Sequence, residues 1–120
     1  MAGRILVVDD EPGIRHMLQQ VLEEEGFEVE TAGSVSEALE KLVQSPVDLA
    51  IVDLLLPGVN GLELAEAVRM LDPGTLVMLI TAYGTVAFES ITSHPAIDFY
   101  LHKPFDLDRF LELVYLCVTP

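Results

Sequence analysis

The sequence predicts an α/β protein: a flavodoxin-like, doubly wound five-stranded parallel sheet of strand order 2-1-3-4-5, with five helices. Five strand-like segments alternate with five helix-like segments, and most strand-like runs are continuously apolar, as in sheets covered on both faces. No repeat, low-complexity tract or linker interrupts the 120 residues, so we expect a single domain spanning residues 1–120.

Each strand-like segment is short and rich in aliphatic, β-branched or aromatic residues. The four that do not alternate with polar residues are Arg4–Val8, Asp48–Val52, Leu76–Ile80 and Ile97–Leu101. The remaining segment, Phe27–Thr31, alternates between apolar and polar residues, which is typical of an edge strand with one face near water. Right-handed crossovers leave few topologies, and the order 2-1-3-4-5 puts this second strand at an edge.

The first two predicted helices have recognisable start and stop signals. One begins at Pro12, which a first turn tolerates, and stops at Gly26. The next opens with Ser34 and Glu37 in capping-box spacing and must end before Pro46, because the residue before a proline disfavours helix.

Two further helices are predicted after the third and fifth strands. The earlier one follows Gly61 and is closed by Asp72–Gly74. The later one begins at Asp106, where Phe105 and Phe110 have the spacing of a hydrophobic staple.

The remaining helix, over residues 85–92, is predicted to be short, shifted or mobile. It contains several poor helix formers, and Ser93–Ala96 replaces a glycine-containing turn before the last strand. On the second and third helices, we expect the apolar faces to include Val43 and Met70.

Composition excludes several classes of function. Six Lys and Arg against twenty Asp and Glu give a net charge of −14, so no basic stripe is available for direct nucleic-acid binding. Cys117 is the single cysteine and cannot form an internal disulfide, and no apolar run approaches the roughly 20 residues that span a bilayer. We therefore expect a cytoplasmic protein that binds no membrane. His94 and His102 show no metal-ligand spacing.

Polar residues follow the strands of the predicted sheet at the points where the strands end. Asp9 and Asp10 follow the first strand, Asp53 ends the third, Thr81 ends the fourth and Lys103 ends the fifth. Because the carboxyl ends of parallel strands meet at one edge of a sheet, we expect these side chains to converge there.

The chemistry of this set points to a phosphate site with a divalent cation. Three carboxylates a few ångströms apart would repel one another unless a cation were present, and Mg²⁺ prefers such oxygen ligands. Lys103 would add a charge for phosphate oxygens, and the Thr81 hydroxyl would donate a hydrogen bond. Taken singly, Asp9 and Asp10 could equally cap the following helix, and Thr81 or Lys103 would be ordinary surface residues. The phosphate site is favoured because all of these residues fall at the same edge of the predicted sheet.

Four blocks of the sequence resemble the signature blocks of response-regulator receiver domains, the CheY-like phosphoacceptors of two-component signalling. These blocks are Val7–Pro12, Asp53–Gly61, Thr81–Gly84 and Lys103–Phe105. The likeness covers the whole chain, and four blocks in order at four strand ends are specific where each alone is not.

The resemblance implies a role for each site residue. Asp53 would be the phosphoacceptor, Asp10 a direct Mg²⁺ ligand, Asp9 a mostly water-mediated ligand, and the backbone carbonyl of Leu55 a further ligand. Lys103 would contact the phosphate. Together with Asp53, Lys103 and Thr81 would be the catalytic residues. Thr81 and Tyr100 would form the switch, the alternative for Tyr100 being a strand residue packed in the core.

The resemblance also implies the function and the partners. The phosphoryl group would come from the phosphohistidine of a sensor histidine kinase, and the surface of helix 4, strand 5 and helix 5 would then switch to control an output domain in cis or a partner protein. A homodimer through this surface is compatible with the family. The domain would not be an enzyme in the ordinary sense, although weak Mg²⁺-dependent self-phosphorylation and autodephosphorylation are expected. Tyr83-Gly84 and Lys103–Asp108 are similar to receivers of NtrC-type transcriptional activators, which favours an excised piece of such a regulator.

Three other classes of protein stay open as alternatives. A docking module that works without phosphorylation would share the fold, but the acidic residues and Lys103 are all retained here. A flavodoxin-like small-molecule binder needs a phosphate loop rich in Gly, Ser and Thr where this chain has Asp9–Glu11. Dehalogenase-like phosphatases need an Asp-x-Asp block after the first strand, which is absent.

Overall fold

The computed structural model describes residues 3–53, 55–56, 59–81 and 94–120, and in these ranges it has a central parallel sheet between two layers of helices. The strand order is β2-β1-β3-β6-β7, which confirms the predicted order 2-1-3-4-5. The five strands are β1 (Arg4–Val8), β2 (Glu28–Ala32), β3 (Leu49–Asp53), β6 (Leu76–Thr81) and β7 (Phe99–His102).

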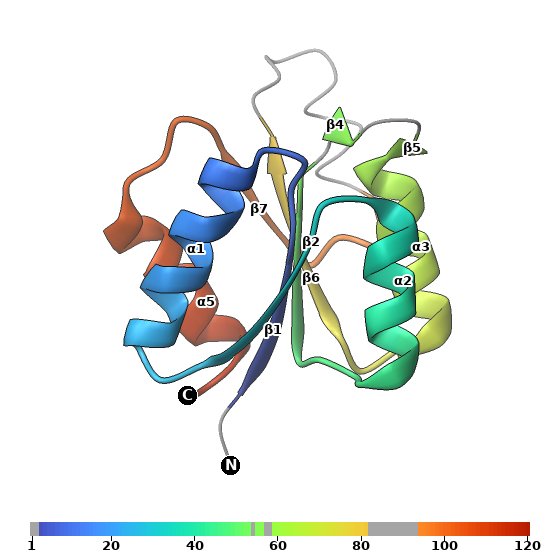
Figure 1. The fold of residues 1–120 in the computed structure, drawn as a ribbon, viewed down its shortest axis with the longest axis horizontal. Helices are drawn as coiled ribbons and strands as arrows, with labels where there is room; N and C mark the ends of the chain where they lie inside the picture. The colour runs from blue at the N-terminus through green and yellow to red at the C-terminus, as the bar shows by residue number, and fades with distance from the viewer. Residues whose placement is uncertain (1–2, 54, 57–58, 82–93) are drawn as a thin grey trace.

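Four helices lie within the described ranges: α1 (Pro12–Glu24), α2 (Val35–Gln44), α3 (Gly61–Leu71) and α5 (Leu107–Cys117). Figure 1 shows α1 and α5 on one face of the sheet and α2 and α3 on the other. The helix predicted over residues 85–92 lies outside the described residues. No helix in the ranges that the structure describes is long and apolar enough to cross a membrane.

The pleat of the strands divides the core into two layers. Ile5 and Val7 on β1 face the layer under α1 and α5, whereas Leu6 and Val8 face the layer under α2 and α3. Both sets are apolar because both faces are covered, and all five residues of β3 are buried for the same reason. On the edge strand β2, Glu28 and Glu30 are exposed, as the alternating pattern predicts.

The helix ends follow the signals in the sequence. The Ser34 hydroxyl accepts a hydrogen bond from the backbone N–H of Glu37 at 3.2 Å, and the Asp106 carboxylate accepts one from the N–H of Arg109 at 2.7 Å. Gly26 adopts a φ of +98° directly after α1, a conformation that side chains disfavour. The rings of Phe105 and Phe110 stack with centroids 5.7 Å apart, which confirms the predicted staple.

Two predictions about helix faces were wrong. Met70 is 87% exposed and Val43 is 70% exposed. Met70 lies two positions after the buried Val68, about 200° around an ideal helix, and Val43 lies one position after the buried Leu42, about 100° around it. Both residues therefore point away from the core. The structure also adds an antiparallel pair of two-residue strands that we did not predict, β4 (Leu55–Leu56) and β5 (Val59–Asn60), in the connection from β3 to α3.

Candidate functional site

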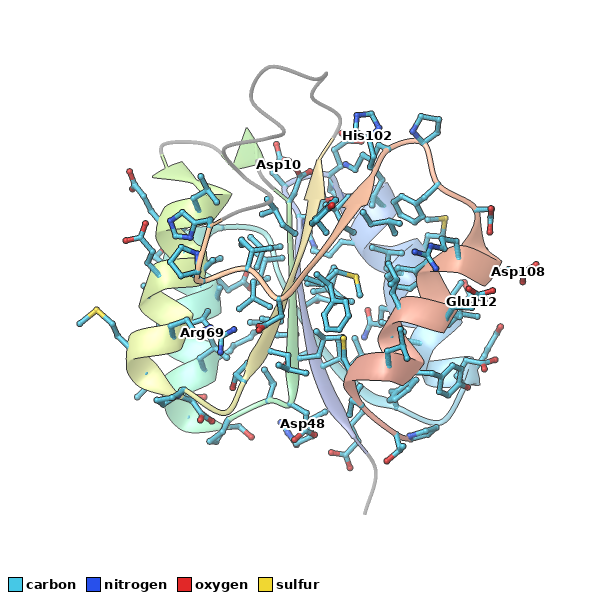
Figure 2. The ribbon with its side chains drawn as sticks, turned by 180° about the vertical axis from the view of Figure 1, so that it is seen from behind. Asp10, Asp48, Arg69, His102, Asp108 and Glu112 are labelled. Carbon is cyan, nitrogen blue, oxygen red and sulfur yellow. The ribbon has the colours of Figure 1, made fainter. Side chains whose placement is uncertain are left out.

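Three carboxylates meet at the carboxyl ends of β1 and β3. One oxygen from each of Asp9, Asp10 and Asp53 lies within 4.8 Å of the other two. Asp9 is 2% exposed and Asp53 is 7% exposed, whereas Asp10 is exposed. The pairing of β1 with β3 and of β3 with β6 in parallel brings these strand ends together. In Figure 2, Asp10 lies at the same end of the molecule as His102 at the end of β7, opposite Asp48.

Asp9 is held through its backbone and its side chain. Its N–H donates to the carbonyl of Ala32 at 3.1 Å, and its carbonyl accepts from Nη1 of Arg15 at 2.7 Å. Its carboxylate Oδ1 accepts from the N–H of Glu11 at 2.9 Å, and Oδ2 lies 3.7 Å from Nζ of Lys103. Asp9 is therefore a fixed member of the cluster, whereas its neighbour Asp10 is the exposed member.

The electrostatics of the cluster work against the ionised form of Asp9. Burial raises the pKa of Asp9 to about 6, and the negative charge of Asp53 adds to this, whereas the N–H of Glu11 and the charge of Lys103 lower it. Placing like charges in a desolvated site costs free energy unless a cation compensates them.

Lys103 supplies part of that compensation. Its Nζ donates to Oδ2 of Asp53 at 3.1 Å, and its side chain is 20% exposed. Burial by itself would lower the pKa of Lys103, but the hydrogen bond to Asp53 and the charges of Asp53 and Asp9 raise it overall. The lysine is therefore charged and directed at the two buried carboxylates. Against three ionised carboxylates, one positive charge still leaves two negative charges in excess.

The donor set fits a hard divalent cation. All three side chains offer oxygen atoms, which Mg²⁺ and Ca²⁺ prefer, and the carboxylate of Asp10 has no partner among the residues the structure describes. A fully closed protein cage is not needed, because Mg²⁺ usually keeps several waters.

The other predicted site residues are placed in part. Thr81 ends β6 and is paired with His102, and Leu55 begins β4 two residues after Asp53; their side chains lie outside the described structure. Tyr100 lies on β7 and is 41% exposed, so it is not packed in the core. Tyr100 also interacts with another residue of the chain.

One residue of the site escaped the sequence reasoning. Arg15 reaches from the first turns of α1 to the carbonyl of Asp9 and is half-buried beside Gly33. An arginine six positions after an aspartate belongs to no recurring motif, and a side chain that binds a backbone carbonyl leaves no pattern of residue types to detect.

Known proteins share this arrangement of sequence and fold. The model of a family described as response regulator receiver domain matches residues 5–115. The response regulator protein PilR of Pseudomonas aeruginosa is 41% identical over 113 residues, which are 92% of this chain and 25% of PilR. Sporulation initiation phosphotransferase F of Bacillus subtilis is 31% identical over 95% of this chain and 92% of its own length.

Solved structures agree. The response regulator TrrA of Thermotoga maritima, in complex with Mg²⁺ and BeF, has a TM-score of 0.86 and 41% identity over 97% of this chain and 99% of that one. A CheY-like receiver domain of Methanospirillum hungatei has a TM-score of 0.90 and 34% identity, covering 97% of this chain and 93% of its own. The chain thus spans about a quarter of PilR and nearly all of the shorter relatives.

Proposed function

Since the chain belongs to the response regulator receiver domain family, whose members are phosphoacceptor signalling domains, we propose that Asp53 is the residue that takes the phosphoryl group. The observation that carries this proposal is the setting of Asp53. It is a buried carboxylate at the carboxyl end of β3, 3.1 Å from Nζ of Lys103 and grouped with Asp9 and Asp10. Nζ of Lys103 lies within hydrogen-bond distance of Asp53, at 3.1 Å, but 3.7 Å from Asp9. Asp53 is also the member of the cluster that belongs to the central strand, β3.

The same proposal assigns Mg²⁺ to the acidic cluster. Asp9, Asp10 and Asp53 would hold the ion together with the backbone carbonyl of Leu55. When bound, the ion would neutralise charge on the oxygens of the transferring phosphoryl group. The donor chemistry of the cluster and the bound Mg²⁺ of the Thermotoga relative support this assignment.

The reaction balances as a transfer between two nucleophiles. A carboxylate oxygen of Asp53 forms a bond to phosphorus while the bond from phosphorus to the histidine nitrogen of a sensor kinase breaks. The electron pair of that bond stays on the imidazole, which takes up a proton. Lys103, already 3.1 Å from Asp53, would pair with a phosphoryl oxygen as negative charge spreads over the transferring group.

The signal would leave the domain at the edge of the sheet formed by β7, opposite the edge strand β2. Thr81 would turn toward the new phosphate, and Tyr100 would change position with it, which would bias a surface that includes β7 and α5. The partners would be a cytoplasmic sensor histidine kinase and an output domain, or a second copy through this surface. The relatives PilR and NtrX of Brucella abortus extend well beyond the region that this chain matches.

Phosphorylation of the purified chain tests the proposal. With Mg²⁺ and a small-molecule phosphodonor, the intact mass should show one phosphoryl adduct. The adduct should be lost in Asp53→Asn and on chelation of the metal. Asp48→Asn is the matched control, because Asp48 lies at the opposite end of the sheet. No adduct on the wild type, with the fold intact, would favour a docking module that works without phosphorylation.

A further inference from the structure

Arg15 makes a contact that bears on the metal site without touching the metal. Its Nη1 donates to the backbone carbonyl of Asp9 at 2.7 Å, and that carbonyl belongs to the peptide that joins Asp9 to Asp10. The orientation of a peptide plane sets the direction in which the next residue leaves it. Arg15 therefore acts on the geometry of Asp10, whose own carboxylate has no partner in the described part of the chain.

The two aspartates differ in how they are held. Asp9 has the N–H of Glu11 on one carboxylate oxygen and Lys103 near the other, so its side chain is fixed by direct contacts. Asp10 is exposed, and within the described ranges its placement depends on the backbone that carries it. The Arg15 contact fixes this backbone between β1 and α1, together with the hydrogen bond from the N–H of Glu11 to the Asp9 carboxylate.

Gly33 leaves the space that the guanidinium of Arg15 occupies. A Cβ atom built on Gly33 would lie 2.9 Å from Nη1 of Arg15 and 3.4 Å from its Cζ. The guanidinium therefore lies against the glycine at the turn between β2 and α2, where a side chain would displace it. The φ angle of Gly33 is not positive, so alanine is compatible with the backbone, and the atom that must move is the end of a flexible side chain.

We propose that Arg15, packed against Gly33, is a positioning residue of the metal site. It orients the peptide between Asp9 and Asp10 and so places the Asp10 carboxylate for binding of the divalent cation. The inference rests on the proposed metal site and adds residues to it. Partners that orient metal ligands typically contribute about 10-fold or more to metal affinity.

The direction in which Mg²⁺ affinity changes when Arg15 is removed distinguishes a positioning role from a purely electrostatic or purely structural one. If Arg15 acted only as a nearby positive charge, removing it would tighten Mg²⁺ binding, because like charges repel. If Arg15 served only the stability of the fold, its removal would leave the affinity for Mg²⁺ unchanged. A positioning role predicts weaker binding in spite of the lost positive charge.

The test is a Mg²⁺ titration of the ¹⁵N-labelled chain followed by amide chemical shifts. Arg15→Met should weaken Mg²⁺ binding about 10-fold, and Gly33→Ala should weaken it in the same direction. Gly13→Ala is the matched control, because a Cβ at Gly13 meets nothing within 4 Å. It should bind Mg²⁺ like the wild type.

Coupling between the variants shows whether Arg15 acts through Asp10. The double variant Arg15→Met with Gly33→Ala should bind no more weakly than Arg15→Met alone, and in an Asp10→Asn background Arg15→Met should have little further effect. Unchanged or tighter binding by Arg15→Met, with the wild type binding Mg²⁺, would overturn this inference alone. No Mg²⁺ binding by the wild type would overturn the metal site as well.

Discussion

The buried carboxylate of Asp9 lowers the stability of the fold when it is ionised and no metal is bound. Burial and the charge of Asp53 raise its pKa to about 6, well above the usual value of 3.8. In the metal-free protein, ionised Asp9 is therefore less favourable in the folded state than in the unfolded state. The folded protein retains protons on Asp9 that the unfolded chain has lost, so Asp9 stabilises the fold at low pH, and this contribution is lost as the pH rises through about 6.

The replacement Asp9→Asn isolates this contribution, because an amide keeps an oxygen for the N–H of Glu11 and cannot ionise. In chelator, the variant should be more stable than the wild type at neutral pH, by on the order of 1–3 kcal/mol. The difference should shrink as the pH falls from about 6 toward about 4. Urea unfolding across that range measures it. A wild type that is the more stable protein at neutral pH without metal would contradict this account of the cluster.

At the scale of elements, α5 begins with a cap that lies close in sequence to Lys103 of the site. Asp106 accepts the N–H of Arg109, and the stacked Phe105 and Phe110 fix the path by which the chain enters the helix. Lys103 lies three residues before this cap, so the start of α5 and the position of the lysine are linked.

Removing the cap should be costly, whereas exchanging it for another capping residue should not. Asp106→Ala should lower the free energy of unfolding by about 1 kcal/mol, and Asp106→Ser should recover most of that loss. Chemical denaturation of the three proteins gives the comparison. Equal losses in both variants would mean that the charge of Asp106, and not its hydrogen bond, supports the helix.

The elements that the sequence predicted best are those set by local rules. The strands and the ends of α1, α2 and α5 follow from apolar runs, proline, glycine and capping residues, and the structure places them within a few residues of the prediction. The short β4–β5 pair was missed, because two-residue strands carry no periodicity. Val43 and Met70 were misplaced since being apolar does not reveal which side of a helix a residue occupies.

The site was predictable to the extent that topology determines it. Parallel strands bring their carboxyl ends to one edge, and this principle alone predicts that Asp9, Asp10, Asp53 and Lys103 lie together, as the structure has them. Arg15 was not predictable, since its role depends on a side chain reaching a backbone carbonyl across the turn between β1 and α1.

The whole molecule carries a net charge of −14, and the acidic cluster contributes to its self-repulsion. Figure 1 shows both termini at the end of the sheet opposite the carboxyl ends of β1 and β3, where the cluster lies. A chain continuing past either terminus would therefore start away from the proposed phosphoryl site, and a signal to an output domain there would have to pass through the fold.

Salt and Mg²⁺ should stabilise the molecule by different routes. Any salt screens the general repulsion, but Mg²⁺ at the same ionic strength should raise the Tm further, because it binds the folded state at a specific site. This surplus should be lost in Asp10→Asn, whereas the effect of NaCl should persist. An equal response to the two salts in the wild type would argue that Mg²⁺ only screens charge.

The central claim, that Asp53 accepts the phosphoryl group, is tested most directly by locating the modification. Borohydride reduction converts an aspartyl phosphate to homoserine, which marks the acceptor in a peptide map read by tandem mass spectrometry. After reaction with a phosphodonor in Mg²⁺, we predict homoserine at position 53 and at no other aspartate. Homoserine at position 9 or 10, or a phosphoryl group that resists borohydride because it sits on a hydroxyl, would contradict the claim.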